Sequence, residues 1–243
     1  MRLEWILLAL TLIGCGSTDH AMKPVDAGAA INVGSIKGNI APGANCEYST
    51  DGAIISEGSF DLAPSMRPPG RCTNSYNAVL LVASHWKPPP PNDSIEPNVL
   101  SVSSAEVALT TSEKRPIAFE FNGEKLANPF SVSVTALQLR PASGKTPELG
   151  LAPVEIIPRA YGPSLGEFVG ERILISVTLY GQSTSGDDAL FPPFLYPVAL
   201  CNGCSTFCRS QPEADSAMRQ IAGDATCADG SGVDGRVCVD PDC

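Results

Sequence analysis

The sequence predicts an all-β protein, an antiparallel β-sandwich with a barrel as the second choice. Three observations carry this prediction. Apolar and polar residues alternate over several runs, turn-forming residues separate these runs at short intervals, and no long helical period interrupts them. Strands without crossover helices cannot form a parallel sheet, so we expect antiparallel sheets packed face to face.

The alternation is clearest from Ile173 to Leu179, where every second residue is apolar. It recurs at Ile117, Phe119 and Phe121, which would share one face of a strand. A continuous apolar run at residues 78–83 predicts a central strand that is buried on both faces.

Two runs change phase, which predicts β-bulges. The apolar positions of residues 130–139 shift from even to odd, indicating a bulge near Ala136. A similar shift occurs between residues 100–102 and 107–109, with Ser103 and Ser104 at the change.

Turns are predicted where Gly, Pro, Asn, Asp and Ser gather between the runs. They begin at Arg67 (RPPG), Lys87 (KPPPPND), Phe121 (FNGEK), Pro141 (PASGK) and Gly181 (GQSTSGDD).

The N-terminus has the layout of an export signal. Met1 and Arg2 supply a positive start, and an apolar segment from Trp5 to Ile13 is too short to span a bilayer. The segment ends in Leu12-Ile13-Gly14-Cys15, which resembles the lipobox of bacterial lipoproteins. This resemblance implies that the chain is cut before Cys15 and that Cys15 carries the lipid.

Lipid on Cys15 would anchor the protein to a membrane, because two or three acyl chains together hold a protein there almost permanently. Gly16 and Ser17 follow the cysteine. In enteric lipoproteins an Asp at that place marks retention in the inner membrane, so its absence favours the outer membrane of a bacterial envelope.

Composition divides the chain into four parts. Residues 1–14 are the expected signal peptide, and residues 15–43, small and polar, are the expected flexible tether. Residues 44–200 are the expected sandwich, and residues 201–243 form a cysteine-rich cap. One short helix is expected at residues 210–223, where Ser210 and Glu213 have capping-box spacing.

Eight cysteines remain besides Cys15, an even number in a chain expected to be exported. We predict that they form four disulfides, because oxidising compartments preserve such bonds. Cys46 is expected to pair with Cys72, leaving the six terminal cysteines to pair among themselves. The eight predicted disulfide residues are Cys46, Cys72, Cys201, Cys204, Cys208, Cys227, Cys238 and Cys243.

Two other roles for the terminal cysteines were weighed. A structural zinc site could use Cys201, Cys204 and two later thiols, but the second half lacks C-x2-C spacing and a nearby histidine. Cys201 and Cys204 could instead form a redox pair of thioredoxin type, which requires a helix start within a βαβ unit that this sequence does not indicate.

Catalytic motifs are weak. Gly162-Pro163-Ser164-Leu165-Gly166 matches the G-x-S-x-G pattern of hydrolases, but no histidine follows it and the next residues resemble a strand, so we predict a turn there. Residues 228–235 fail the EF-hand pattern, which leaves only loose calcium binding by Asp229 and Asp234 as an alternative. We therefore predict no catalytic residues, no metal and no cofactor.

The net charge of −10 argues against nucleic acid or an anionic lipid surface as a partner, because phosphates would be repelled. The whole layout resembles the cysteine-rich surface lipoproteins of deltaproteobacterial, myxobacterial type, although this likeness transfers no functional residue. The expected function is a non-enzymatic envelope or surface interaction and adhesion module with a protein or surface-glycan partner. A carboxylate-dependent hydrolase with its site on sandwich loops is the second hypothesis, and a periplasmic thiol oxidoreductase is the third.

Overall fold

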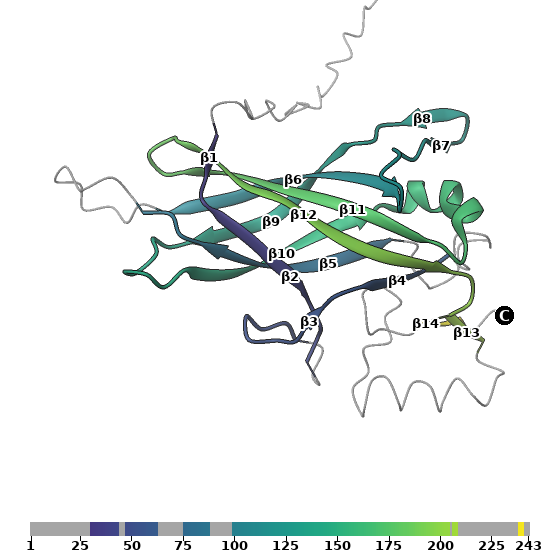
Figure 1. The fold of residues 1–243 in the computed structure, drawn as a ribbon, viewed down its shortest axis with the longest axis horizontal. Coiled ribbons are helices and arrows are strands. Elements are labelled where there is room, and N and C mark those ends of the chain that lie inside the picture. Colours follow the sequence, from purple (N-terminus) through teal and green to yellow (C-terminus); the bar gives the residue numbers. More distant parts are fainter. Residues whose placement is uncertain are drawn as a thin grey trace, which may run out of the picture.

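The protein is a β-sandwich in the computed structural model, which describes residues 30–43, 47–62, 75–87 and 99–204 and two short strands at 206–208 and 238–240 (Figure 1). The predicted fold class is confirmed. The larger sheet has the order β1 (Ile31–Asn32), β12 (Asp188–Cys201), β11 (Arg172–Ser183), β6 (Leu100–Thr111) and β9 (Phe130–Leu139), with β4 (Gly58–Asp61) also beside β12. The smaller sheet has the order β10 (Glu148–Ile157), β5 (Tyr76–Ser84), β2 (Gly34–Ile40) and β3 (Ile54–Ile55).

Three further elements lie outside the two main sheets. Strands β7 (Phe119–Phe121) and β8 (Glu124–Leu126) form a hairpin, and β13 (Thr206–Cys208) pairs in parallel with β14 (Cys238–Asp240). A 3-10 helix, η2 (Arg159–Phe168), connects β10 to β11.

The core between the sheets follows the predicted alternation. Ile173, Ile175 and Leu179 of β11 are fully buried, and Val177 is 1% exposed. Every residue of the run at 78–83 is buried within β5, as predicted for a strand covered on both faces. Burial of such side chains is the main force that holds the two sheets together.

Both predicted bulges are confirmed, and they lie opposite each other. Strand β6 pairs Val102 with Leu137 and Ser104 with Ser133 of β9, so the register shifts between these pairs. Ser103 is also the extra residue where β6 pairs with β11. The phase changes seen in the sequence therefore mark one irregular place in the larger sheet.

The predicted tether is wrong for residues 31–40, because β1 and β2 lie within it. Strand β2 buries Ile36 and Ile40 beside β5. Its glycines suggested a linker, but they are required by close packing. A Cβ on Gly34 would contact the carbonyl oxygen of Ala83, and a Cβ on Gly38 would contact the side chain of Ile54.

The strand predicted at residues 117–121 is shorter than expected. Ile117 and Phe119 are buried, but β7 begins only at Phe119, and Phe121 is 39% exposed. Before β7, Pro116 forms an isolated bridge with Thr110 and the Ile117 N–H donates to the Leu109 carbonyl oxygen, so this part of the chain bonds to β6 instead of β8. Asn122 and Gly123 have positive φ angles of 52° and 83°, as a tight hairpin turn requires, and this turn ends β7. The predicted turns at 141–145 and 181–188 contain Gly144 and Gly186, both with positive φ.

The two ends of the sandwich differ. We define the entry end as the end where β1 pairs with Ala189 and Leu190, next to the β11–β12 hairpin loop. The far end holds η2, the β7–β8 hairpin and the close of β12 at Cys201 (Figure 1). Strand β11 runs from the far end to the entry end over 12 residues, which is roughly 36 Å at about 3.3 Å per residue.

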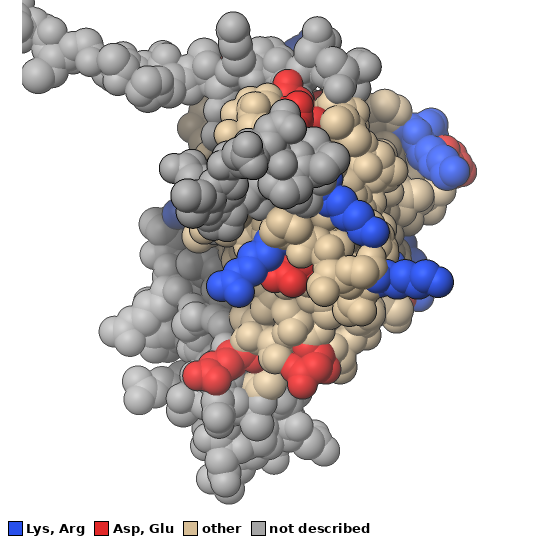
Figure 2. Space-filling model, turned by 90° about the vertical axis from the view of Figure 1, so that its left-hand side faces the viewer, with Lys and Arg blue, Asp and Glu red and all other residues tan. Residues whose placement is uncertain are grey.

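The entry end carries basic and acidic side chains on its described surface (Figure 2). Most basic groups lie across the middle with some acidic groups among them, and further acidic groups lie near the top and the bottom of this view. Neither sign covers this whole face.

Several predictions fall on parts of the chain that the structure does not describe. The signal segment with Cys15, the helix at 210–223, and Cys46, Cys72, Cys227 and Cys243 lie outside the described residues. Within the described ranges, no helix has the length and apolar character needed to cross a bilayer.

Candidate functional site

Strand β12 brings distant parts of the chain to the far end. Its outer edge pairs in parallel with β1 at Ala189 and with β4 at Val198 to Cys201. Between these contacts lies a register shift at Pro192 and Pro193, which have no N–H group to donate to a neighbouring strand. The pairing with β4 places Asp61 opposite Cys201.

The interior of the sandwich offers no polar site among the described residues. Four polar or charged residues are buried there, and each makes hydrogen bonds to the fold: Asn39, Asp61, Ser84 and Ser183. Ser84, for example, donates to the carbonyl oxygen of Val33 at 3.3 Å.

Buried hydrogen bonds of one side chain, Asn39, join the two sheets. The side-chain amide of Asn39 donates to the Tyr196 hydroxyl at 3.0 Å, while its carbonyl oxygen accepts from the Val79 N–H at 2.9 Å. Burial raises the pKa of Tyr196 to about 12, with a smaller rise from Glu57 and an opposing effect of the Asn39 hydrogen bond. Tyr196 is therefore a neutral structural group at ordinary pH.

A depression of the surface lies at the far end, between the β7–β8 hairpin and η2. It is open to solvent and has a volume of about 560 Å³. Its apolar floor includes Ile117, Phe119 and Leu126, and its rim carries four polar side chains: Glu120, Lys125, Ser164 and Glu167. We call it the far-end cavity.

Side-chain contacts hold the two walls of the far-end cavity in place. The Ser164 hydroxyl accepts from the Glu120 N–H at 3.0 Å and donates to the Glu120 carbonyl oxygen at 3.1 Å. The Tyr161 hydroxyl donates to the Ala127 carbonyl oxygen at 2.7 Å, and its ring lies 4.6 Å, between centroids, from those of Phe119 and Phe130. The cavity is thus formed by a braced helix and hairpin.

The G-x-S-x-G motif lies in this brace. The turn predicted there is instead part of the 3-10 helix η2, because Tyr161 and Leu165 are buried and pull the segment onto the sandwich. Both hydrogen bonds of the Ser164 hydroxyl go to backbone groups. His85, the histidine of the described ranges, lies at the entry end, where its backbone N–H donates to the Val33 carbonyl oxygen, so no described histidine is placed to take the Ser164 proton.

Two carboxylates, Glu120 and Glu167, line the rim of the far-end cavity. Both side chains are exposed. The sequence did not select this pair, since the residues are 47 positions apart and only the packing of η2 on β7 brings them together.

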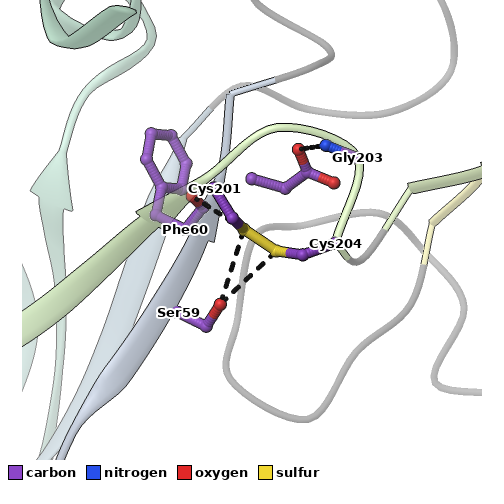
Figure 3. Close-up of a disulfide and its surroundings, with 6 residues drawn as sticks. Ser59, Phe60, Cys201, Gly203 and Cys204 are labelled. Atoms are coloured by element: carbon purple, nitrogen blue, oxygen red, sulfur yellow. Dashed lines mark hydrogen bonds between the residues drawn. A yellow bond between two sulfur atoms is a disulfide. The ribbon is translucent and has the colours of Figure 1, made fainter. Parts of the chain in front are cut away.

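The second feature of the far end is a disulfide between Cys201 and Cys204 (Figure 3). Cys201 is the last residue of β12, and Gly203 has a φ of 80°, which lets the chain turn sharply. The Ser59 hydroxyl lies 3.7 Å and 3.6 Å from the two sulfur atoms, and the Asp61 carboxylate accepts from the Gly203 N–H at 2.7 Å. We call Asp61, Cys201 and Cys204 the cysteine-turn cluster.

The surroundings of this disulfide differ from those of a thioredoxin-type pair. Cys201 ends a strand, and a bend at residues 202–204 follows it, whereas the low thiol pKa of such enzymes depends on a helix start. The pairing of the remaining cysteines stays a prediction. Cys208 and Cys238 lie on the paired strands β13 and β14.

Ser59 and Asp61 were not predicted as neighbours of this disulfide. They come from β4, about 140 residues earlier in the chain, and parallel pairing between such distant short strands leaves no local pattern.

Comparison with known proteins gives only distant likenesses. No protein-family model matches the chain, and no curated protein matches it. A pilin subunit, CooA of enterotoxigenic Escherichia coli, is 11% identical with a TM-score of 0.29, covering 69% of this chain and 98% of the pilin. A cohesin module from a family 33 glycoside hydrolase of Clostridium perfringens is 10% identical with a TM-score of 0.28, covering 71% of this chain and 99% of the module.

Proposed function

We propose that the protein is a non-enzymatic interaction module of the bacterial envelope, anchored by lipid on Cys15, that presents its far end to a protein or glycan partner. One observation carries the proposal: the chain enters the sandwich at one end, and the far-end cavity lies at the other. An anchor before Ile31 would leave the cavity on the side away from the membrane, roughly 36 Å along β11.

The filled interior supports a binding role rather than a catalytic one. The buried polar residues of the described ranges are used for structural hydrogen bonds, and the far-end cavity is shallow enough to leave its charged rim in water. Enzymes usually need groups that water reaches poorly, because electrostatic effects are strong only in such sites. A rim of Glu120, Lys125 and Glu167 over an apolar floor instead suits contact with a partner surface.

The anchor is tested by expressing the full chain and a Cys15→Ser variant in bacteria. We expect the parent chain in the membrane fraction, with the acyl mass on its N-terminal peptide, and the variant outside that fraction. A variant that still sediments with membranes would overturn the anchoring.

The interaction is tested on intact cells that display the full chain, mixed with fluorescent envelope fragments of the same bacterium. The fragments are used untreated, digested with protease, or oxidised with periodate, which separates a protein partner from a glycan partner. Lys125→Glu changes the rim of the cavity, and Lys145→Glu makes the same change on an exposed turn at the entry end.

We expect Lys125→Glu to lower fragment binding severalfold and Lys145→Glu to leave it unchanged. Equal binding by both variants, or no binding above that of cells without the protein, would contradict the proposal.

A second candidate function follows from the paired carboxylates of the rim. Glu120 and Glu167 could serve as the acid and base of a glycoside hydrolase. The test is release of reducing sugar from envelope polysaccharide by the full chain, compared with the Glu120→Gln and Glu167→Gln variants. Release that both substitutions abolish would support the hydrolase, and absence of release would exclude it for these substrates.

A further inference from the structure

We propose that the cysteine-turn cluster is a redox-gated metal site. When the Cys201–Cys204 disulfide is reduced, the two thiolates and the Asp61 carboxylate would bind one divalent ion with an affinity for sulfur, such as Zn²⁺. The proposal is independent of the binding function at the far-end cavity.

The three ligand atoms already lie close together. The two sulfur atoms and a carboxylate oxygen of Asp61 are all within 4.8 Å of one another. Zinc binds thiolate sulfur at about 2.3 Å and carboxylate oxygen at about 2.0–2.2 Å in a tetrahedral arrangement, so its ligand atoms lie roughly 3.5–4 Å apart. After reduction the two sulfur atoms, no longer bonded to each other, must move apart to this spacing, while the Asp61 carboxylate is already within reach of both.

The arrangement is held by contacts other than the disulfide itself. Cys201 lies in register with Asp61 in the parallel pairing of β12 and β4, and the Leu62 N–H donates to the Cys201 carbonyl oxygen at 2.8 Å. The Gly203 N–H donates to Asp61 at 2.7 Å, which fixes the turn against β4 (Figure 3). Reduction breaks the bond between the two sulfur atoms, and neither the strand pairing nor these two hydrogen bonds depends on that bond.

The polarity of the cluster also suits a cation. Asp61 is only 7% exposed, and two thiolates beside its carboxylate would place three negative charges in a small volume. Such charges repel strongly unless a cation lies between them. Cys204 is exposed, so water can supply a fourth ligand, and the Ser59 hydroxyl is placed to donate to the sulfur atoms.

The chemistry balances in two steps. A thiol reductant gives two electrons and two protons to the disulfide, forming two thiols on the protein and a disulfide of the reductant. The metal ion then binds both sulfur atoms and releases two protons. In reverse, a small-molecule disulfide accepts two electrons from the two thiolates and two protons from water and becomes two thiols, while the Cys201–Cys204 bond forms again and the ion is released. The cluster would therefore hold either a disulfide or a metal, never both.

This site differs from the zinc site weighed in the sequence analysis. That hypothesis required two later thiols, whereas the structure brings Asp61 of β4 to Cys201 and Cys204.

The experiment uses the full chain, reduced with a phosphine and then titrated with Co²⁺, which reports thiolate ligands by a charge-transfer absorption in the near ultraviolet. The Cys201→Ser/Cys204→Ser double variant measures the contribution of all other thiols. We expect the parent chain to bind one more Co²⁺ with thiolate absorption than this variant, and we expect no such difference before reduction.

Asp61→Asn tests the carboxylate, because its amide oxygen can still accept from the Gly203 N–H while the negative charge is lost. We expect at least tenfold weaker Co²⁺ binding. Asp51→Asn, a matched change at an exposed turn beside Ser49, should bind as the parent does.

A second measurement uses only the parent chain, so it does not depend on whether a variant folds. Zn²⁺ should protect Cys201 and Cys204 of the reduced parent from alkylation, as mapped by mass spectrometry of peptides. The proposal is overturned if these two thiols react equally with and without Zn²⁺, if the double variant binds as much Co²⁺ as the parent, or if Asp61→Asn does not weaken binding.

Discussion

Replacement of Tyr196 by Phe should change how the stability of the protein depends on pH. Tyr196 is 1% exposed, and its hydroxyl accepts a hydrogen bond from Asn39 across the sandwich at 3.0 Å. At neutral pH the substitution removes this bond, and we expect a loss of about 1–2 kcal/mol in the free energy of unfolding.

The stability advantage of the parent over the Tyr196→Phe variant shrinks at high pH. Because burial raises the pKa of Tyr196 from 10.0 to about 12, the folded protein keeps the proton that the unfolded chain releases. The stabilisation from the neutral hydroxyl is complete below pH 10 and is lost as the pH rises through 12. At pH 11, a difference of two units between the pKa of Tyr196 in the folded and in the unfolded chain lowers the free energy of unfolding by about 1.4 kcal/mol. The Phe variant does not show this loss, because Phe has no proton to release.

Urea unfolding of the parent and the Tyr196→Phe variant at pH 8, 9, 10 and 11 measures this difference. We expect the advantage of the parent to be constant up to pH 9 and to fall by about 1.4 kcal/mol by pH 11. Tyr180→Phe is the control. Tyr180 is only half-buried, and its pKa is raised by burial and by Glu106, so solvent should limit the change.

An advantage for the parent that stays the same at pH 9 and pH 11 would refute the argument. It would mean that water reaches the Tyr196 phenolate in the folded protein, and that the hydroxyl is not buried in a hydrogen bond with Asn39 between the sheets.

Three further substitutions test the fold and the far-end cavity. Gly58→Ala should destabilise the folded protein by about 1–3 kcal/mol in thermal unfolding, because the new Cβ would meet the Tyr76 hydroxyl and lie 2.9 Å from the Tyr196 ring. An unchanged melting temperature would contradict this packing. Leu109→Ala should lower the free energy of unfolding in urea by about 2–5 kcal/mol, because Leu109 is fully buried. The control Leu195→Ala, at a residue that is 55% exposed, should lower it by under about 1 kcal/mol. Similar losses for the two variants would show that β6 does not face the core. Ser164→Ala should lower the free energy of unfolding by about 1–2 kcal/mol and make the β7–β8 hairpin easier to cut with protease, because both hydrogen bonds to Glu120 are lost. We expect no esterase activity in the parent or in the variant. Esterase activity that the substitution abolishes would show that Ser164 is a nucleophile.

Local patterns explain the features that were predicted well. The alternation along β11 and the phase changes at Ser103 and near Ala136 are visible in the sequence, because side chains on a strand point to opposite faces in turn. The hairpin turn at Asn122 and Gly123 is likewise visible, since these residues adopt positive φ most readily.

The features that were predicted wrongly depend on neighbours far away in the chain. The glycines of β2 resemble those of a linker, and only the nearness of Ala83 and Ile54 shows that they are small because space is lacking. Ser164 lies where a turn was predicted, and only the packing of this segment on the sandwich and its two hydrogen bonds to Glu120 show that it belongs to a 3-10 helix held against a hairpin.

The sequence by itself therefore determined the class of fold, the places of most strands, and the expectation of a lipid on Cys15, because strand period, turn composition and the lipobox are all local properties. Only the tertiary structure decided which residues gather at the far end: Glu120 and Glu167 line one cavity, and Asp61 lies beside Cys201 and Cys204. The reason is physical. Contacts between residues some 50 to 140 positions apart are set by how whole strands pair and pack, and no short stretch of sequence records that choice.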